Sequence, residues 1–187
     1  MKKAILAVIF LICCVSICTA QVDKVSTESS STPAKEVPSD AWGKFFPDGL
    51  VDNSGGSVGI DTLSGKIVGI YFSAHWCPPC RAFSPKLVEF RNANSVDFEI
   101  VFVSSDKNEE AQFEYMKEVN MEWPAVKYGS DAANSLKKQF GVTGIPTLVI
   151  LSPNGETLSE DGRGDVESTP DSCLATWKKK AELAPKK

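Results

Sequence analysis

The sequence predicts an α/β fold in which a central, mixed but mostly parallel β-sheet is flanked by helices. Three runs of strand length, at residues 66–73, 98–104 and 147–151, are rich in β-branched and aromatic residues and predict buried strands. Segments in which apolar residues recur at helical spacing separate these runs. Strands that alternate with helices in this way favour a layered sandwich with a largely parallel centre.

The first forty residues are predicted to precede the folded domain. Two lysines come before an apolar run that ends near Val15, and small residues follow as far as Ala20. This pattern predicts a secretory signal peptide over residues 1–20, and hence a periplasmic or secreted protein, with a membrane location only if the segment is retained. Residues 21–40 lack aromatic residues and are rich in Ser, Thr and Pro, so we expect a flexible polar linker before a domain at residues 41–187.

The domain is predicted to begin with a short helix and the first central strand. The aromatic residues Trp42, Phe45 and Phe46 have roughly helical spacing, and the segment 47–49, Pro-Asp-Gly, ends the helix. The run KIVGIYFS at residues 66–73 has apolar residues on both faces, which predicts a central strand.

Two helices are expected around the second strand. Apolar spacing predicts the first over residues 79–91, with Pro85 inside it as the cause of a kink. Asp106 and Glu109 have the spacing of a capping box, which predicts the start of the second helix, ending near Val119.

The remaining elements complete the sandwich. Residues 131–140 predict a helix that Gly141 closes. After the third strand, the turn Pro-Asn-Gly at residues 153–155 predicts a hairpin into a short strand at residues 156–159. A last helix is expected over residues 169–181.

The charge of the chain argues against several classes of partner. Loss of residues 1–20 would remove two lysines and no acid, changing the net charge from −4 to −6. The one basic block, at residues 178–180, is better explained as the end of a helix than as a nucleic-acid or anionic-membrane site. The sequence has no glycine-rich phosphate loop, and we predict no cofactor, no metal, no nucleic-acid partner and a monomeric state.

Two closely spaced cysteines carry the main chemical signal. Three of the six cysteines lie in the predicted signal peptide, which leaves Cys77, Cys80 and Cys173. Cys77 follows the first central strand directly, so its sulfur is predicted to face the unpaired N–H groups and positive dipole of a helix start, where a thiolate is favoured. Cys80 lies one helical turn later and could resolve a mixed disulfide. Trp76 would offer an apolar surface to a polypeptide substrate.

Two other interpretations of the cysteine pair stay open. A purely structural disulfide is one, although a loop this short stabilises little. A zinc site is the other, for which His75 and Cys173 are the available further ligands.

A second signal lies at residues 141–148, GVTGIPTL, where Pro146 directly precedes a buried strand. A cis peptide between Ile145 and Pro146 would turn the chain and expose backbone groups of residue 145 to a visiting peptide. An ordinary trans proline that opens an edge strand is the alternative.

Taken together, the motifs WCPPCR, FGVTGIPTLVI and PNGE resemble those of the thioredoxin superfamily. The segments VGIYFSAHWCPPCRAFSPKLVEF and FEIVFVSSDKNEE are most similar to the nucleoredoxin and tryparedoxin branch, and also resemble periplasmic thioredoxin-like reductases. The resemblance covers about residues 45–164. It implies a thioredoxin fold, Cys77 as the nucleophile, Cys80 as the resolving cysteine and Pro146 as the cis proline beside them.

Three positions depart from this pattern. Tyr71 stands where plain thioredoxins have a buried aspartate, so the usual proton acceptor for Cys80 is absent. His75, next to Trp76, could tune the Cys77 thiolate or could be an exposed histidine without consequence. Cys173 is interpreted as a buried, inert thiol, with a regulatory or intermolecular thiol as the alternative.

The function predicted from the sequence is that of an exported thiol-disulfide oxidoreductase. It would reduce disulfides of other exported proteins by cycling Cys77 and Cys80, with protein or peptide disulfides and dithiols as substrates and an unidentified redox partner as electron donor. Two further functions stay open: a disulfide-forming oxidant, and a redox-inert module that holds extended peptides on the surface of Trp76 and Pro146.

Overall fold

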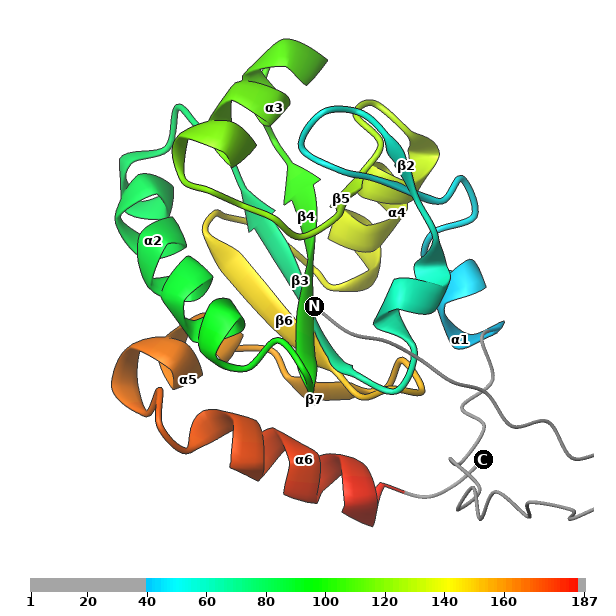
Figure 1. Cartoon of the computed structure of the whole chain (residues 1–187), viewed down its shortest axis with the longest axis vertical. Coiled ribbons are helices and arrows are strands. Elements are labelled where there is room, and N and C mark those ends of the chain that lie inside the picture. Colours follow the sequence, from blue (N-terminus) through cyan, green and yellow to red (C-terminus); the bar gives the residue numbers. More distant parts are fainter. Residues whose placement is uncertain (1–39, 185–187) are drawn as a thin grey trace, which may run out of the picture. The chain divides into compact units, whose positions relative to one another are not determined.

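A seven-stranded mixed sheet with helices on both faces forms the folded part of the chain (Figure 1). The computed structural model describes residues 40–184. The predicted signal peptide and nearly all of the predicted linker lie outside the described residues. The strand order is β2-β1-β5-β4-β3-β6-β7.

The strands are short at one edge and long at the centre. They are β1 (Leu50–Val51), β2 (Ser57–Val58), β3 (Ile67–Ser73), β4 (Phe98–Ser104), β5 (Ala125–Val126), β6 (Thr147–Leu151) and β7 (Thr157–Ser159). The helices are α1 (Asp40–Gly43), the 3-10 helix η1 (Ile60–Leu63), α2 (Pro78–Ala93), α3 (Glu109–Glu118), α4 (Asp131–Gln139), α5 (Gly162–Ser168) and α6 (Cys173–Leu183).

The sheet is less parallel than the sequence predicts. Strand β3 pairs in parallel with β4, and β4 with β5, but the pairs β3/β6, β6/β7, β1/β5 and β1/β2 are antiparallel. Strands β1, β2 and β5 have two residues each, which is too short for any apolar periodicity to show in the sequence. Only the centre of the sheet is therefore parallel.

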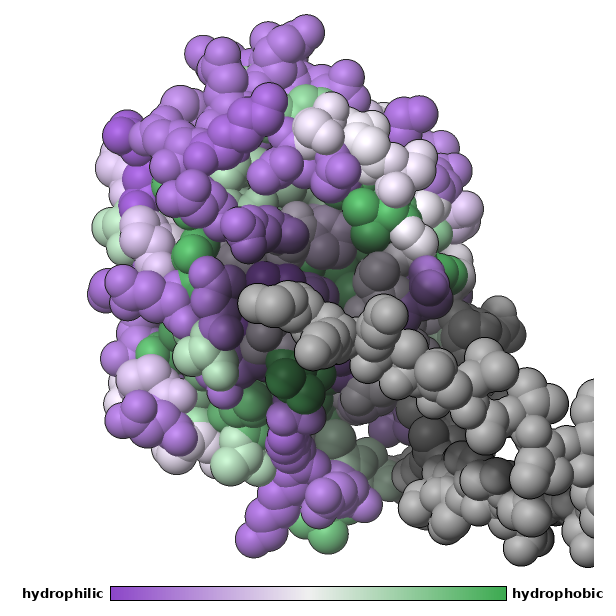
Figure 2. Space-filling model, in the orientation of Figure 1, coloured by the Kyte–Doolittle hydropathy of each residue, from purple (hydrophilic) through white to green (hydrophobic). Residues whose placement is uncertain are grey.

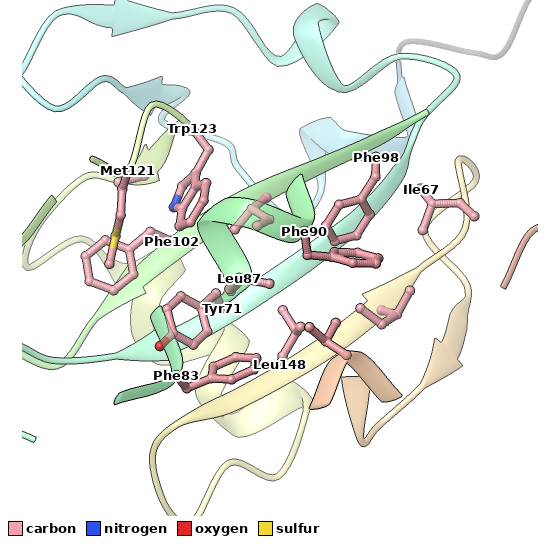
Figure 3. Packing of buried hydrophobic residues seen from close by; sticks show 14 of the residues in the cluster. Ile67, Tyr71, Phe83, Leu87, Phe90, Phe98, Phe102, Met121, Trp123 and Leu148 are labelled. Atoms are coloured by element: carbon pink, nitrogen blue, oxygen red, sulfur yellow. The ribbon is translucent and has the colours of Figure 1, made fainter. Parts of the chain in front are cut away.

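Alternate side chains of β3 point to opposite faces of the sheet, so they contribute to two separate hydrophobic clusters. Tyr71 packs in the cluster under α2 and α6, whereas Ile70 and Phe72 belong to the cluster on the other face, with Trp42 and Leu136. Figure 3 shows the first cluster, where Tyr71, Phe83 and Leu87 lie together between the sheet and α2. All seven residues of β3 are buried, as a central strand requires.

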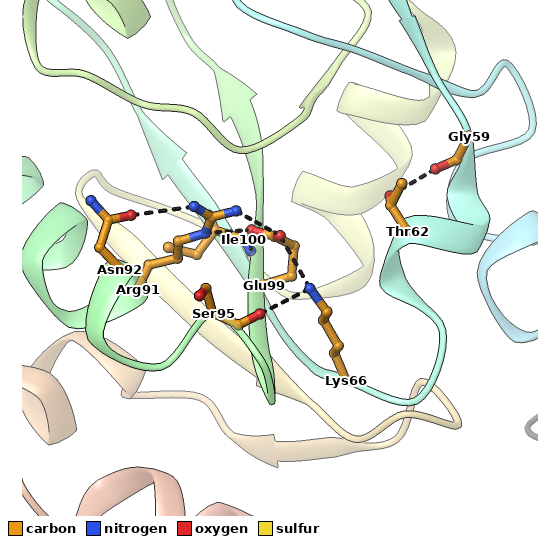
Figure 4. Close-up of polar contacts among 8 residues, drawn as sticks. All are labelled: Gly59, Thr62, Lys66, Arg91, Asn92, Ser95, Glu99 and Ile100. Atoms are coloured by element: carbon orange, nitrogen blue, oxygen red, sulfur yellow. Dashed lines mark hydrogen bonds and ion pairs between the residues drawn. The ribbon is translucent and has the colours of Figure 1, made fainter. Parts of the chain in front are cut away.

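An ionic cluster ties the C-terminal part of α2 to the start of β4 (Figure 4). Arg91 donates to both carboxylate oxygens of Glu99, from Nε at 2.9 Å and from Nη2 at 2.8 Å. The Glu99 carboxylate also accepts from the backbone N–H of Ile100 at 3.0 Å, and Nζ of Lys66 lies 3.6 Å away. These charge-assisted contacts raise the pKa of Arg91 above its ordinary value.

Two of the predicted helices differ in the structure. The N-terminal cap of α3 is Asn108, whose side chain accepts from the N–H of Ala111, so the predicted capping box of Asp106 and Glu109 does not form. The predicted final helix is preceded by a separate helix, α5, which the sequence analysis missed. Its glycine-rich stretch, GRGDVES, has low intrinsic helix propensity, and Asp161 caps it by accepting from the N–H of Gly164 at 3.1 Å.

Candidate redox site

Cys77 and Cys80 form a disulfide where β3 passes into α2. Cys77 is the N-terminal cap of α2 and has extended backbone angles, with φ −95° and ψ 107°. Its sulfur accepts from the N–H of Cys80 at 3.3 Å, one of the helix donors that have no partner within the helix. Cys77 is 4% exposed and Cys80 is fully buried. Both cysteines are therefore buried, and Cys77 is the one that keeps some contact with solvent.

The predicted proline loop lies beside this disulfide. The peptide bond between Ile145 and Pro146 is cis, in agreement with the expectation from the sequence. The carbonyl oxygen of Ile145 is 3.7 Å from Sγ of Cys77, and the Ile145 side chain packs against Ala74 and both cysteines. Pro146 itself is buried, so Ile145 is the partly accessible member of the pair.

Trp76, the residue before Cys77, presents an exposed apolar side chain. Its side chain is 58% exposed, and its Nε1 donates to the carbonyl oxygen of Ser105 at 3.0 Å. Besides Trp76, the large exposed hydrophobic side chains among residues 40–184 are Val96, in the loop between α2 and β4, and Leu183, at the end of α6. Figure 2 shows that hydrophilic residues predominate over the face seen in Figure 1, with hydrophobic residues in small separate patches.

The loop before the cysteines is anchored to the loop after β4. The backbone N–H of His75 donates to Oδ1 of Asp106 at 2.8 Å, and Oδ2 of Asp106 accepts from Oγ of Ser104 at 2.7 Å. Asp106 was predicted to cap α3, but the structure uses its carboxylate to hold the redox loop instead. No local sequence pattern could reveal this role, because 31 residues separate the two partners.

Tyr71 belongs to a buried chain of hydroxyl groups beneath α2. Its phenol is 2.8 Å from Oγ of Ser84, which is 2.6 Å from the phenol of Tyr115, which in turn is 3.2 Å from Oγ of Ser73. Burial raises the pKa of the Tyr71 phenol well above its ordinary value. At the position where plain thioredoxins have an acid, this protein therefore holds a neutral group.

The sequence analysis missed three residues around the site, namely Ser84, Tyr115 and Glu118. Oε2 of Glu118 lies 2.6 Å from Nε2 of His75, and Oε1 lies 3.6 Å from Nη2 of Arg81. Ser84 is on α2, the helix that begins at the cysteines, whereas Tyr115 and Glu118 are on α3, which meets α2 only in the folded chain. Their helical spacing indicated the faces of α2 and α3, but not which residue each face would meet.

The remaining candidates do not join this site. Cys173 is free and buried in the hydrophobic cluster with Phe90 and Trp177, where burial raises the pKa of its thiol to about 11. Within the described part of the chain, no group of three or more His, Cys, Asp or Glu side chains is placed to hold a metal ion. The structure therefore does not assemble the ligand set that the zinc interpretation requires. None of the helices in residues 40–184 has the length and apolar character needed to cross a membrane.

Comparisons with known proteins agree on one family. A family model described as thioredoxin-like matches residues 65–157. Mouse nucleoredoxin is 43% identical over 138 residues, which cover 72% of this chain and 31% of that protein. The chain thus spans about a third of the length of the curated relatives it matches.

Solved structures show the same likeness. Tryparedoxin II from C. fasciculata has 32% sequence identity and a TM-score of 0.66, over 72% of this chain and 91% of that chain. Thioredoxin from Wuchereria bancrofti has 41% identity and a TM-score of 0.60, over 70% of this chain and 93% of that chain.

The relatives correct one prediction. Nucleoredoxins are intracellular proteins of the cytoplasm or nucleus, so the exported, periplasmic or secreted location predicted from the first twenty residues is wrong. The residues on which that prediction depended lie outside the described part of the chain.

Proposed function

This chain belongs to the thioredoxin superfamily, as a thioredoxin-like protein of the nucleoredoxin and tryparedoxin type, and on that premise we propose that it reduces disulfides through a Cys77-Cys80 couple. Nucleoredoxins and tryparedoxins are thiol-disulfide oxidoreductases. The observation that carries the proposal is the Cys77-Cys80 disulfide at the start of α2, in which Cys77 keeps 4% exposure and Cys80 is fully buried.

The two cysteines have different roles in this proposal. Cys77 is the nucleophile because, once reduced, its sulfur keeps the N–H of Cys80 and the helix dipole as stabilisers of a thiolate. The thiolate attacks a substrate disulfide, which forms a mixed disulfide and releases the first substrate thiol. Cys80 then attacks Sγ of Cys77, and the electron pair of the broken bond leaves on the second substrate sulfur. The products are the Cys77-Cys80 disulfide and two substrate thiols.

The surface around Cys77 supports substrates with an extended backbone. Trp76, the residue before Cys77, offers an exposed ring, and Ile145 offers an apolar side chain and a carbonyl oxygen 3.7 Å from the Cys77 sulfur. An extended peptide that contacts both residues would bring its backbone close to Cys77. Small thiol compounds are the second substrate class that we propose, because tryparedoxin II has been solved in complex with glutathionylspermidine.

Trapping of the mixed disulfide tests these roles. Cys80→Ser should accumulate a covalent complex with a peptide disulfide, because the attacking thiolate is retained and the resolving thiol is lost. Cys77→Ser is the matched control and should form none. The intact protein, supplied with a dithiol reductant, should reduce the disulfides of insulin, and both variants should lose this activity. A complex with Cys77→Ser instead of Cys80→Ser would overturn the assignment of the nucleophile.

The reduction potential tests the direction of electron flow. A reduction potential of about −270 mV, as in thioredoxin, supports a reductase, whereas a potential of about −120 mV is that of a strong oxidant. If no reversible couple is found, the enzyme proposal fails and a peptide-binding module becomes the better explanation.

A further inference from the structure

His75 is held in place at the edge of the redox site from three directions. Its Nε2 lies 2.6 Å from Oε2 of Glu118, and its ring stacks on Tyr115 with centroids 5.4 Å apart and planes 19° apart. Its backbone N–H donates to Asp106. A solvated surface histidine would have none of these contacts, so the ring orientation is set by the fold.

Four charged or titratable groups face this histidine. They are Glu118 and Tyr115 from α3, Arg81 from α2 and Asp106 from the loop after β4. The Asp106 carboxylate bonds the backbone N–H of His75 and Oγ of Ser104, so it does not meet the ring. Arg81 reaches the second oxygen of Glu118. Glu118 is therefore the carboxylate that engages the imidazole.

The position and type of this residue make it a candidate proton carrier for the couple. His75 lies two residues before Cys77 and is the one histidine in the chain. The charge of a histidine ordinarily changes between about pH 5 and 8, where no other unperturbed side chain titrates. Tyr71 cannot serve in its place, because burial keeps the phenol neutral.

We propose that His75 and Glu118 form a redox-linked proton site, in which the imidazole takes up one proton when the disulfide is reduced. A dithiol reductant gives two electrons and two protons and becomes a disulfide. The electrons break the Cys77-Cys80 bond, one proton goes to Cys80 and the other to His75. The products are a Cys77 thiolate, a Cys80 thiol and an imidazolium beside Glu118. Oxidation by a substrate disulfide returns both protons to the two substrate thiols.

Glu118 acts here as a positioning residue, since it holds the ring and balances the charge of the imidazolium. The inference deepens the proposed function, but it requires only a reversible Cys77-Cys80 couple and no particular direction of electron flow. If the imidazolium stabilises the thiolate, the thiolate must stabilise the imidazolium by the same factor. The titration of His75 should therefore depend on the redox state.

Nuclear magnetic resonance of the single histidine ring measures this dependence directly. The full chain is titrated as the disulfide and after reduction with dithiothreitol. We expect the titration midpoint of the His75 signals to be higher in the reduced protein by about half a pH unit or more. By linkage, this difference is a factor of about three in the redox equilibrium constant, or about 15 mV in the reduction potential. In Cys77→Ser, which cannot form the thiolate, dithiothreitol should not move the midpoint.

Variants of α3 test the part played by Glu118. Glu118→Gln should shrink the difference between the His75 midpoints of the oxidised and reduced protein. The matched control is Glu114→Gln, because Glu114 is exposed on the same helix and takes part in none of the ion pairs of residues 40–184. It should titrate like the unmodified protein.

Two outcomes overturn the inference. One is an equal His75 midpoint in the oxidised and reduced protein, and the other is a Glu118→Gln titration that matches Glu114→Gln. A redox-dependent midpoint without reduction of insulin would leave the proton site in place and refute the reductase proposal. Reduction of insulin with a constant midpoint would refute the proton site alone.

Discussion

Removal of the Glu99 carboxylate should destabilise the fold, because it leaves the charge of Arg91 without its partner. The Glu99 side chain is 7% exposed and that of Arg91 is 15% exposed, and two charge-assisted hydrogen bonds of 2.8 and 2.9 Å join them. Loss of one partner of a buried ion pair typically costs about 3–5 kcal/mol, because the other charge stays desolvated. Arg91 retains some contact with water, so we expect Glu99→Leu to lower the free energy of unfolding by about 3 kcal/mol. For a chain of this size that corresponds to a fall of about 6–12 °C in melting temperature.

A double-mutant cycle separates this effect from the loss of packing. The double variant Arg91→Leu, Glu99→Leu removes both charges. Its free energy of unfolding should lie within about 1 kcal/mol of that of the unmodified protein. Lys66, the third member of the cluster, keeps its bond to the carbonyl oxygen of Ser95 at 3.0 Å. Urea unfolding of all variants in the same redox state, followed by tryptophan fluorescence, gives the free energies.

An exposed ion pair provides the control for the cycle. Lys86 is 3.2 Å from Glu167, with side chains 60% and 33% exposed, so Lys86→Gln should cost less than about 1 kcal/mol. A buried, unpaired Arg91 is refuted as the cause if Glu99→Leu lowers the free energy of unfolding by no more than this control. It is also refuted if the double variant is less stable than Glu99→Leu, since the unpaired charge would then not be the cause.

Further predictions concern single residues of the domain. In the reduced native protein, the Cys77 thiol should react quickly with an alkylating reagent at pH 8, and Cys173 should react only after unfolding, because burial raises the pKa of its thiol to about 11. Because that pKa lies above the usual 9.0, the contribution of the protonated Cys173 thiol to the free energy of unfolding is complete below about pH 9 and is lost as the pH rises through 11. Urea unfolding of Cys173→Ala should not show this loss. Gly162→Ala should lower the free energy of unfolding by about 1–3 kcal/mol, because the added Cβ would lie 2.6 Å from Cγ1 of Ile150 and 2.9 Å from the carbonyl oxygen of Leu148. The control is Gly144→Ala, whose added Cβ meets open space and should be tolerated. Tyr71→Phe removes one buried hydrogen bond while Ser84 keeps Tyr115 as a partner, so a loss of about 1 kcal/mol is expected and a loss above about 3 kcal/mol would contradict this account.

The central elements could be predicted from the sequence because their signals are local. Strands β4 and β6 have the predicted bounds, since runs of β-branched and aromatic residues are bounded by turn residues on both sides. The helix at residues 131–139 ends next to Gly141, whose φ of +59° is the left-handed conformation expected of a glycine after a helix. The cysteine pair was visible in the same way, whereas local residues left a trans Pro146 open and the family resemblance implied the cis peptide that the structure has.

The order of the main elements, the family and the cysteine pair could be predicted from the sequence, because all three depend on local spacing and side-chain chemistry. The folded structure sets which groups meet across long separations. It used Asp106 to anchor the redox loop instead of capping α3, and it brought Glu118 to His75 and Tyr115 to Ser84. It also places the antiparallel strands β1 and β2 at one edge of the sheet, where two residues each are too few to leave a pattern in the sequence. For the polar side chains, each is satisfied by whichever partner the packing of β4 and α3 against α2 provides, and the local sequence carries no record of that partner.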